Sequence, residues 1–590
     1  MNLITRTTLL AVALFTVSPT YSAGIPPSSV ELSRQVATLS DEIAVMSGQV
    51  TDSEGAPLHG VMVRLGDDGM GTAESVFTDA QGNYTLKTRL NGNLYLRLRK
   101  PYYRDYREVV TLDAEATAQK NFVMEPMVDA TEISESLPAA YHFATLPFQI
   151  DENAPFSRDQ FQRDCLTCHQ IGNPYTRTPP RSLEVWKGII TRMHTYVANF
   201  DMSMVPERAA ILVKGFNEDT KPLTVRPEFP LDEALNNAKI YEYRLAPAYI
   251  PHDTIYNPND GLLYTVDQGL DYVAVTDMAS AKTEYVFQAD GLATLYRAGT
   301  DVDGQPVFKE FPAGLRQGPH SLAMGLDKKY YITNSNSKSI GVFDPKTRRF
   351  EASYLIPEET GPGYPHTIRL DDEGMLWFTQ SLSDQVARLN PTTGEFTVLT
   401  PPARKPIGTF AGSTQVYGID IHPVDGTIWY SRLYADKIGR IDPKTLEITE
   451  FDSPMGGSRR FRFDKQGVLW IAGFKRGTIA RIEIEGDTLK SKVYPLPVFA
   501  EGTYPAAYAL GVHPDTQEIW VNENMTDRIY RFIPSEERFI AYPMPLAGTY
   551  TRDMTFTKEG KVCTSNNPFP PMALEGGVLE LICIDPNYQP

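Results

Sequence analysis

Apolar and polar residues alternate along the second half of the chain in short runs, and these runs recur with similar sequences. Three clear runs are Leu-Trp-Phe-Thr at 376–379, Ile-Trp-Tyr-Ser at 428–431 and Leu-Trp-Ile-Ala at 469–472. A turn and a second apolar run follow each of them, at 386–389, 438–441 and 479–482. Weaker copies begin at Gly261, Asp327, Gln517 and Gly560. Copies with a period of roughly 40 to 50 residues, each with four β-like runs, predict a seven-bladed β-propeller.

The two ends of this repeat predict how the ring closes. The last copy stops after its third strand, at 579–585, whereas the run 239–244 before the first copy resembles a fourth strand such as 447–451. We therefore expect 239–244 to complete the last blade. Cys563 and Cys583 would then lie on neighbouring strands, where they form a disulfide in an oxidising compartment or remain two buried thiols.

Two other patterns precede the propeller. Val30, Leu32, Val36, Leu39 and Ile43 have helical spacing and predict an amphipathic helix. Residues 46–127 alternate between turns such as Asp-Ala-Gln-Gly at 79–82, which predicts a small antiparallel β-sandwich. This span resembles the carboxypeptidase regulatory-like (transthyretin-like) domain. The resemblance implies a structural or adhesive module, without chemistry of its own.

A proline-containing linker at 128–156 leads to three predicted short helices within 157–237. The first has Ser157 as N-cap and extends to about His169, the second follows Ser182, and the third begins at Pro206. The whole chain is thus expected to be mainly β, with an N-terminal sandwich, a small α-helical domain and the propeller at 238–590.

The first helix carries Cys165-Leu166-Thr167-Cys168-His169. Two thiols at this spacing can bind both haem vinyl groups, and the next histidine can bind the iron. A redox disulfide or half of a zinc site is the alternative, although zinc would need a second ligand pair. The three helices resemble a minimal class I cytochrome c domain. That resemblance implies a sixth iron ligand, for which Met204 is our first candidate, Met202 the second and His194 the competitor.

The N-terminal residues have the pattern of a secretory signal. Arg6 precedes the apolar run 9–17, and small residues at 22–24 predict cleavage after residue 23, which leaves 24–45 as a helix and linker. An uncleaved anchor is the alternative. Since haem is attached outside the bacterial cytoplasm, we expect a soluble periplasmic protein without an integral membrane segment. The net charge of −17 argues against a nucleic-acid partner.

Residues 238–590 resemble the virginiamycin B lyase (streptogramin lyase) family, through Pro-His-x-Ile, Leu-Trp-Phe-Thr and Ile-Gly-Arg-Ile. In that family a histidine near the start of a blade acts as base, and a glutamate after the Trp-Phe-Thr run helps to hold magnesium. Here His366 is followed by Gln380 in place of the glutamate, while Glu523 accompanies Ala509 in place of the histidine. Because no blade carries the pair, the sequence does not predict that lyase activity is retained.

His252, His320 and His366 each follow a proline at equivalent places in successive blades. They are expected to converge on the central channel, with Tyr417, Arg460 and Asp553 continuing the ring. Three imidazoles are suited to a second metal ion such as zinc, copper or iron. The alternative is that Pro-His is turn chemistry of the repeat.

These observations favour a redox protein whose propeller binds a small substrate, with these histidines as its catalytic groups, and whose haem passes electrons to a soluble periplasmic carrier. A metal-dependent lyase and a binding or sensing propeller are the alternatives. Fold alone does not decide among them.

Overall fold

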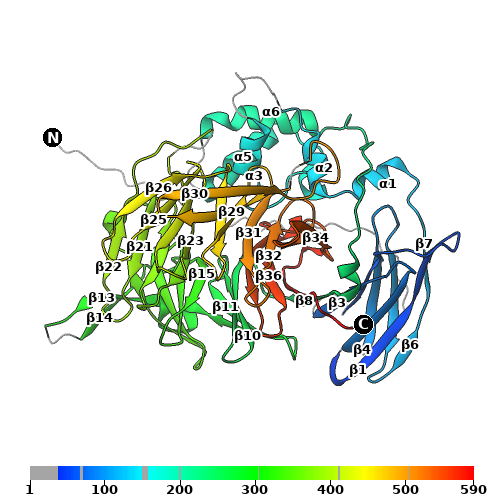
Figure 1. The fold of residues 1–590 in the computed structure, drawn as a ribbon, viewed down its shortest axis with the longest axis horizontal. Helices are drawn as coiled ribbons and strands as arrows, with labels where there is room; N and C mark the ends of the chain where they lie inside the picture. The colour runs from blue at the N-terminus through cyan, green and yellow to red at the C-terminus, as the bar shows by residue number, and fades with distance from the viewer. Residues whose placement is uncertain are drawn as a thin grey trace.

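The computed structural model describes residues 38–66, 71–148, 157–197, 201–302, 305–408, 412–503 and 505–590 (Figure 1). The predicted signal peptide and the first part of the segment 24–45 lie outside the described residues. Every described helix is too short or too polar to span a bilayer.

The propeller strands form six separate sheets among the described residues. The first contains β9 (Pro251–Asn257), β10 (Leu262–Asp267), β11 (Tyr272–Asp277) and β12 (Lys282–Phe287). The second contains β15 (Pro319–Met324), β16 (Tyr330–Asn334), β17 (Ser339–Asp344) and β18 (Arg349–Leu355), and is extended by β13 (Leu295–Thr300) and β14 (Pro306–Glu310). The third contains β19 (Pro365–Leu370), β20 (Leu376–Gln380), β21 (Gln385–Leu389) and β22 (Phe396–Leu399).

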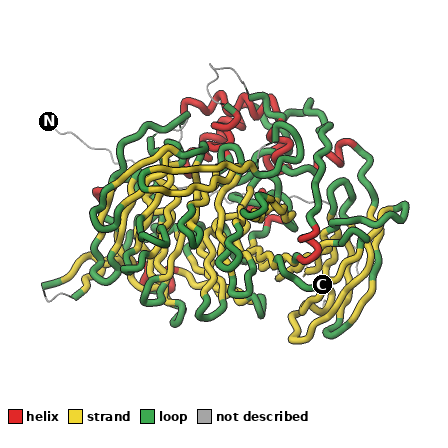
Figure 2. The backbone as a smooth tube through the Cα atoms, in the orientation of Figure 1, coloured by secondary structure: helices red, strands yellow, loops and turns green. Residues whose placement is uncertain are grey.

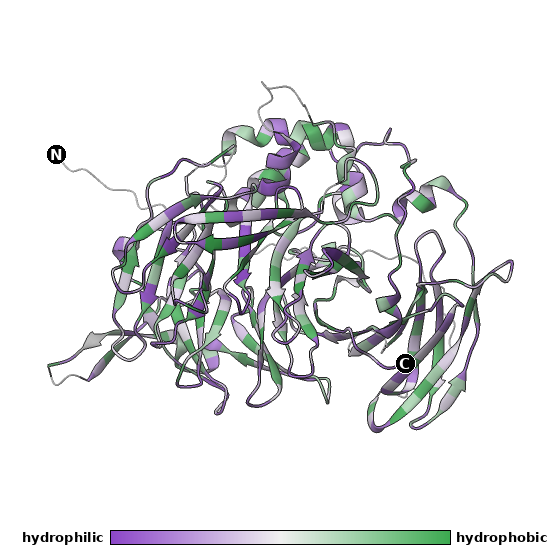
Figure 3. Ribbon diagram, viewed as in Figure 1, coloured by the Kyte–Doolittle hydropathy of each residue, from purple (hydrophilic) through white to green (hydrophobic). Residues whose placement is uncertain are grey.

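The fourth sheet contains β23 (Val416–Ile421), β24 (Ile428–Arg432), β25 (Lys437–Ile441) and β26 (Ile448–Asp452). The fifth contains β27 (Ser458–Phe463), β28 (Leu469–Gly473), β29 (Thr478–Glu485) and β30 (Thr488–Pro495), and the sixth contains β31 (Ala507–Val512), β32 (Ile519–Glu523), β33 (Arg528–Ile533) and β34 (Arg538–Pro543). Hydrophobic and hydrophilic residues alternate along these strands (Figure 3). The repeated tryptophans are buried between neighbouring sheets: Trp377, Trp429, Trp470 and Trp520.

The last four propeller strands are β35 (Thr551–Phe556), β36 (Val562–Asn566), β37 (Glu580–Asp585) and β8 (Lys239–Arg244). β8 pairs with β37, as the sequence predicts, and β35 contacts β9, so that the innermost strands form a closed ring. The other edge of β8 pairs with β3 of the N-terminal domain, which merges these strands into an eleven-stranded sheet. The prediction of seven separate blades is therefore wrong for the last one, because its outer edge is continued by another domain.

The N-terminal β domain consists of β1 (Thr38–Asp52), β2 (Met62–Gly66), β3 (Thr72–Phe77), β4 (Asn83–Arg99), β5 (Tyr106–Leu112), β6 (Thr117–Gln119) and β7 (Phe122–Met124). β4 pairs with β1 along its first half and with β2 and β5 along its second, so the sheet folds over the core around Val63, Leu86 and Leu96. Leu39 and Ile43, which were predicted in a helix, lie in β1. Strand pairing outweighs the helical spacing there.

The helices lie together over one side of the propeller (Figures 1 and 2). They are α1 (Ala130–Glu135), α2 (Ala139–Ala144), α3 (Arg158–Cys165), α4 (Pro174–Arg177), α5 (Leu183–Val197) and α6 (Val205–Gly215), with the short 3₁₀ segment η1 (Met202–Met204). A further 3₁₀ segment, η2 (Glu233–Asn237), contacts β3 of the N-terminal domain instead. Phe161 and Trp186 share one core with Tyr508, Met525 and Tyr550 of the propeller. The predicted separate haem domain at 157–237 is corrected accordingly: these helices have no independent core, because the propeller supplies part of it.

Candidate functional site

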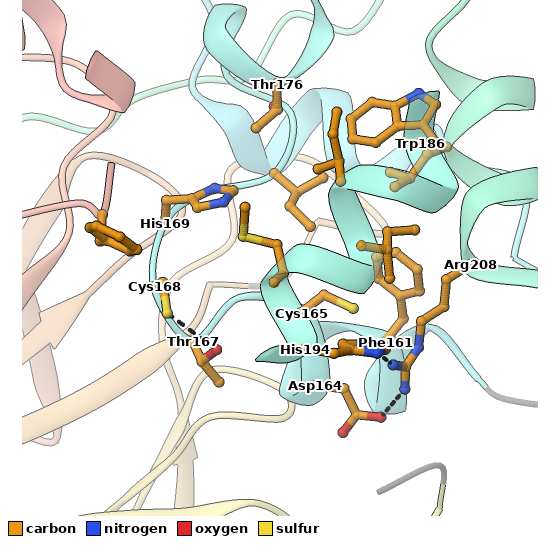
Figure 4. Close-up of a pocket in the computed structure, with 16 residues that line it drawn as sticks. Phe161, Asp164, Cys165, Thr167, Cys168, His169, Thr176, Trp186, His194 and Arg208 are labelled. Atoms are coloured by element: carbon orange, nitrogen blue, oxygen red, sulfur yellow. Dashed lines mark hydrogen bonds and ion pairs between the residues drawn. The ribbon is translucent and has the colours of Figure 1, made fainter. Parts of the chain in front are cut away.

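A pocket lies between the helices of this layer and the propeller (Figure 4). Cys165, Cys168 and His169 line it together, and apolar side chains form most of the remaining wall: Phe161, Ile171, Trp186, Ile189, Ile190, Leu212 and Phe569. The sequence motif and the second and third predicted helices therefore meet around one enclosed space.

The start of α3 is fixed by a capping box, in which the Ser157 hydroxyl accepts the Gln160 backbone N–H and the Gln160 side chain accepts the Ser157 N–H. The helix ends at Cys165, earlier than predicted, since Leu166 leaves the helical conformation. Cys168 and His169 consequently lie on the loop that follows. The two cysteines are not bonded to each other, and burial raises the pKa of Cys165 to about 12, which argues against a thiolate-based redox pair.

His169 is oriented by its own neighbour. Its Nδ1–H donates to the Gln170 carbonyl oxygen at 2.7 Å, which leaves Nε2 as the nitrogen available to a metal. Burial lowers the pKa of this imidazole and favours the neutral form that metals bind.

The candidates for a sixth ligand are placed differently. His194 lines the cavity, whereas Met202 and Met204 do not, and Met202 is 47% exposed. His194 Nδ1–H donates to Met202 Sδ at 3.0 Å, and His194 Nε2 accepts from Arg208 at 2.9 Å, so both ring nitrogens are engaged. Met193 of α5, which was not among the predicted ligands, is the methionine that lines the cavity. Its position on α5 was visible in the sequence, but its direction was not.

A second candidate site lies where the innermost propeller strands begin. His252, His320 and His366 are the second residues of β9, β15 and β19. Their rings lie 3.8 Å apart between His252 and His320 and 4.1 Å apart between His320 and His366, and Tyr417 continues the row at 4.1 Å from His366. The predicted convergence of the three histidines is thus present in the structure.

These histidines are buried and neutral. Burial lowers the pKa of His252 to about 4 and holds the pKa values of His320 and His366 well below their usual range. Ligand atoms of His252, Asp253 and His320 all lie within 4.8 Å of one another, which is compatible with a metal ion. Arg460 opposes such an ion, because its Nη1 lies 2.8 Å from both Asp253 oxygens.

The sequence missed three residues of the ring. Arg459, Tyr508 and Arg552 are the second residues of β27, β31 and β35, one position before the predicted Arg460, Ala509 and Asp553. Each of these strands has a register shift at this place, and such bulges turn adjacent side chains toward one side. Arg460 and Asp553 still meet across the channel, at 3.1 Å. Counting from the start of each strand would have found the missed residues.

The cavity and the histidine ring are neighbours. The Tyr550 hydroxyl donates to the Leu166 carbonyl at 2.7 Å, and the Phe569 N–H donates to the Cys168 carbonyl at 3.0 Å. The Gln162 amide donates to the carbonyls of Phe474 and Pro505. Hydrogen bonds therefore attach the Cys-x-x-Cys-His segment to the ends of the propeller strands.

The glutamate that the sequence singled out has a structural role. Both Glu523 oxygens accept backbone N–H groups, from Ala506 and Met525 on one side and from Thr526 on the other. His366 Nδ1 instead contacts the Thr367 hydroxyl at 2.9 Å. The histidine and glutamate of a lyase are therefore not paired in this ring.

Cys563 and Cys583 are joined by a disulfide between β36 and β37. It links the last two strands of the chain at the edge where the propeller closes.

Comparisons with known proteins concern the two β domains. Residues 306–505 match the virginiamycin B lyase family, and residues 45–125 match the carboxypeptidase regulatory-like domain. A virginiamycin B lyase of Nocardia farcinica (strain IFM 10152) is 26% identical over 136 residues, which are 23% of this chain and 43% of that protein. This chain thus spans less than half the length of that relative.

Among solved structures, a streptogramin B lyase is 18% identical, with a TM-score of 0.45, and the match covers 60% of this chain and 99% of that one. Virginiamycin B lyase from Staphylococcus aureus is 16% identical, with a TM-score of 0.43 and coverage of 58% and 99%. The chain thus contains a propeller similar to that of the virginiamycin B lyase family and an N-terminal carboxypeptidase regulatory-like domain.

Proposed function

We propose that this protein carries a covalently bound haem c and acts as a periplasmic electron-transfer protein or oxidoreductase. The observation that supports the proposal is that both thiols and His169 line one mostly apolar pocket. Haem is a large, flat and mostly apolar group, so these residues fit it. Cys165 and Cys168 would hold its vinyl groups and His169 Nε2 its iron.

We assign the sixth position to Met193 in place of Met204 or Met202, because it is the methionine that lines the cavity. His194 stays the competitor, although it would have to release Arg208 or Met202 before it could bind iron. The haem supplies one-electron redox chemistry when it is bound. Trp186, Ile190 and Leu212 would keep water from it.

The channel is the proposed substrate site. Its histidines lie next to the cavity, so a small molecule there would be close to the redox centre, and a soluble electron carrier would be the partner. The acidic surface implied by the net charge of −17 favours a carrier with a basic face.

An optical spectrum of the protein exported to the periplasm, oxidised and reduced, tests the proposal, together with the mass of the denatured chain. We expect a low-spin c-type spectrum and a mass increase of one haem. A chain without haem after export in the presence of the attachment machinery would contradict the proposal.

The second candidate is a metal-dependent lyase, which the family match at 306–505 favours over a haem oxidoreductase. Its metal would be held by His252, Asp253 and His320. Metal analysis and turnover of a cyclic depsipeptide by the protein test it. The Arg460 ion pair with Asp253 and the absence of a His–Glu pair in the described ring count against it.

A further inference from the structure

Two buried arginines of the channel have no carboxylate partner. Arg459 and Arg552 are 1% and 5% exposed, and neither lies within ion-pair distance of an aspartate or glutamate in the part of the chain that the structure describes. Burying a guanidinium without a counter-charge is costly, because the lost hydration is not replaced. A protein that keeps two such groups together therefore calls for an explanation.

The other charged residues of the channel do not supply a counter-charge for Arg459 and Arg552. Three aspartates are matched by three arginines through ion pairs, namely Asp253, Asp420 and Asp553 with Arg369, Arg460 and Arg462. This set is neutral by itself, so Arg459 and Arg552 add two positive charges that it does not offset.

Aromatic rings hold these two guanidinium groups. The Arg459 guanidinium lies 3.9 Å from the centre of the Phe474 ring and 4.5 Å from that of Tyr508. The Arg552 guanidinium lies 4.5 Å from the centre of the Tyr550 ring, and its Nε donates to Asn567 Oδ1 at 2.7 Å. Both groups also border the Tyr508 ring, and ring faces stabilise them only in part.

Several hydrogen-bond donors around them are unused. Nε and Nη1 of Arg459 and Nδ2 of Asn567 are buried and have no hydrogen-bond partner among the residues that the structure describes. Buried donors of this kind are rare unless a water or ligand completes them. The Tyr508 oxygen already accepts from Tyr417 at 3.1 Å and from Arg552 at 3.2 Å, so it offers the Arg459 donors little more.

We propose that Arg459 and Arg552 bind the carboxylate of a small ligand at the top of the propeller channel, beside the Cys-x-x-Cys-His segment. Guanidinium groups match the planar geometry and charge of a carboxylate, and Asn567 supplies a neutral donor. The inference deepens the proposed function, because it gives the class of the substrate as a carboxylic acid, and it rests on that function for what happens to the ligand after binding.

A haem propionate is the other conceivable source of a carboxylate. Both sources share the same chemistry, and the titration distinguishes them: an added acid binds only if the arginines are free, whereas arginines that hold propionates would change the haem spectrum when they are replaced.

The test is calorimetric titration of the exported, full-length protein with acetate and with benzoate, at constant chloride and ionic strength. We expect saturable binding of at least one of them, weakened about tenfold or more in Arg459→Gln and Arg552→Gln, since each loses a charge-assisted hydrogen bond. Arg316→Gln, at a side chain that is 63% exposed, should bind as the parent does. Arg459→Lys keeps the charge and should recover part of the affinity.

The outcomes separate this inference from the proposed function. Carboxylate binding to a chain that lacks haem would keep the inference and remove the haem. A haem-containing protein that binds neither acid, or that binds them equally well in both glutamine variants, would overturn the inference. A normal haem spectrum in the parent that changes in both variants, without carboxylate binding in any of them, would mean that the arginines serve the propionates, and would also overturn it. Arg459→Lys is the folding control, because it keeps the positive charge at the site. If this variant folds and yet neither it nor the parent binds a carboxylate, the proposal is contradicted.

Discussion

The cavity and the channel are both buried and lie side by side, yet the side chains that line them differ in polarity. The pocket wall is mostly aliphatic and aromatic, and two thiols and the imidazoles of His169 and His194 also line it. The channel is lined by imidazoles, phenols, carboxylates and guanidinium groups that mostly satisfy one another. An apolar space lined by Cys165, Cys168 and His169 is suited to a large group that stays in place, as proposed above. A polar channel whose arginines exceed its aspartates fits a small ligand that comes and goes.

The boundary between the two regions is the most informative part of this contrast. Tyr550 donates to the backbone beside Cys165, and its ring also stacks against Arg552. One side chain therefore contacts both the Cys-x-x-Cys-His segment and the polar groups of the channel. The four predictions that follow test whether the two regions have separate tasks.

The largest effect is expected from removing a thiol. Cys168→Ala should lose the stable covalent attachment of haem, because one remaining thioether does not hold the group in its orientation. Haem absorbance on a denaturing gel and the mass of the chain measure the effect. Thr167→Ser, which changes the residue between the two cysteines, is the control and should keep the haem. Equal haem content in both variants would place the cofactor elsewhere.

The next effect concerns the channel alone. His366→Ala should lower turnover by about 100-fold or more, which is the range of a lost acid–base group, while the haem spectrum stays as in the parent. His422→Ala is the matched control, since His422 pairs with Asp425 outside the ring. Unchanged turnover in His366→Ala would assign this histidine to packing.

A smaller effect separates the candidates for the iron. Met193→Leu keeps the volume and apolar character of the side chain but removes the thioether, so the charge-transfer band between sulfur and oxidised iron should disappear. Met204→Leu should retain the band. The reverse result would restore Met204 as the ligand, and loss of low-spin iron in His194→Leu alone would favour the imidazole.

The smallest effect is on stability at the seam between the helical layer and the propeller. Burial raises the pKa of Glu523 from 4.5 to about 7, and its loop contacts α2, where the Ala140 N–H donates to the Met525 carbonyl at 2.9 Å. The folded state therefore holds a proton that the unfolded state releases between pH 4.5 and pH 7. The free energy of unfolding should fall over this window as pH rises, by about 3 kcal/mol at most.

Glu523→Gln should flatten this pH dependence, although it also loses acceptors for backbone N–H groups and is less stable overall. Chemical denaturation at several pH values measures the slope. A slope identical to that of the parent would mean that another group titrates in this range.

Much of the architecture could be predicted from the sequence, because several copies of the same strand pattern occur in it. Leu376, Ile428 and Leu469 begin equivalent strands, and the run 239–244 shows which strand completes the last sheet. The pairing of β8 with β3 was not predictable, because the sequence of an edge strand does not indicate which strand of another domain pairs with it. Leu39 and Ile43 show the converse, since two residues at helical spacing are also compatible with a long strand.

The site was predictable only where a short motif carries its chemistry. Cys165, Cys168 and His169 are recognisable by spacing, and the Pro-His pairs indicate three members of the ring. Arg459, Tyr508 and Arg552 follow Ser458, Ala507 and Thr551, which share no obvious motif, and a bulge decides which of two adjacent residues faces the channel. The choice between Met193 and Met204 depends on how α5 is rotated, which the sequence leaves open.

β8 has a consequence for how separate copies of the chain behave. Its two edges are taken, one by β37 and the other by β3, so the sheet that closes the propeller presents no free backbone donors and acceptors there. A chain shortened by its first 127 residues would expose this edge as a template for strands of other molecules. We therefore expect the N-terminal domain to limit self-association of the propeller.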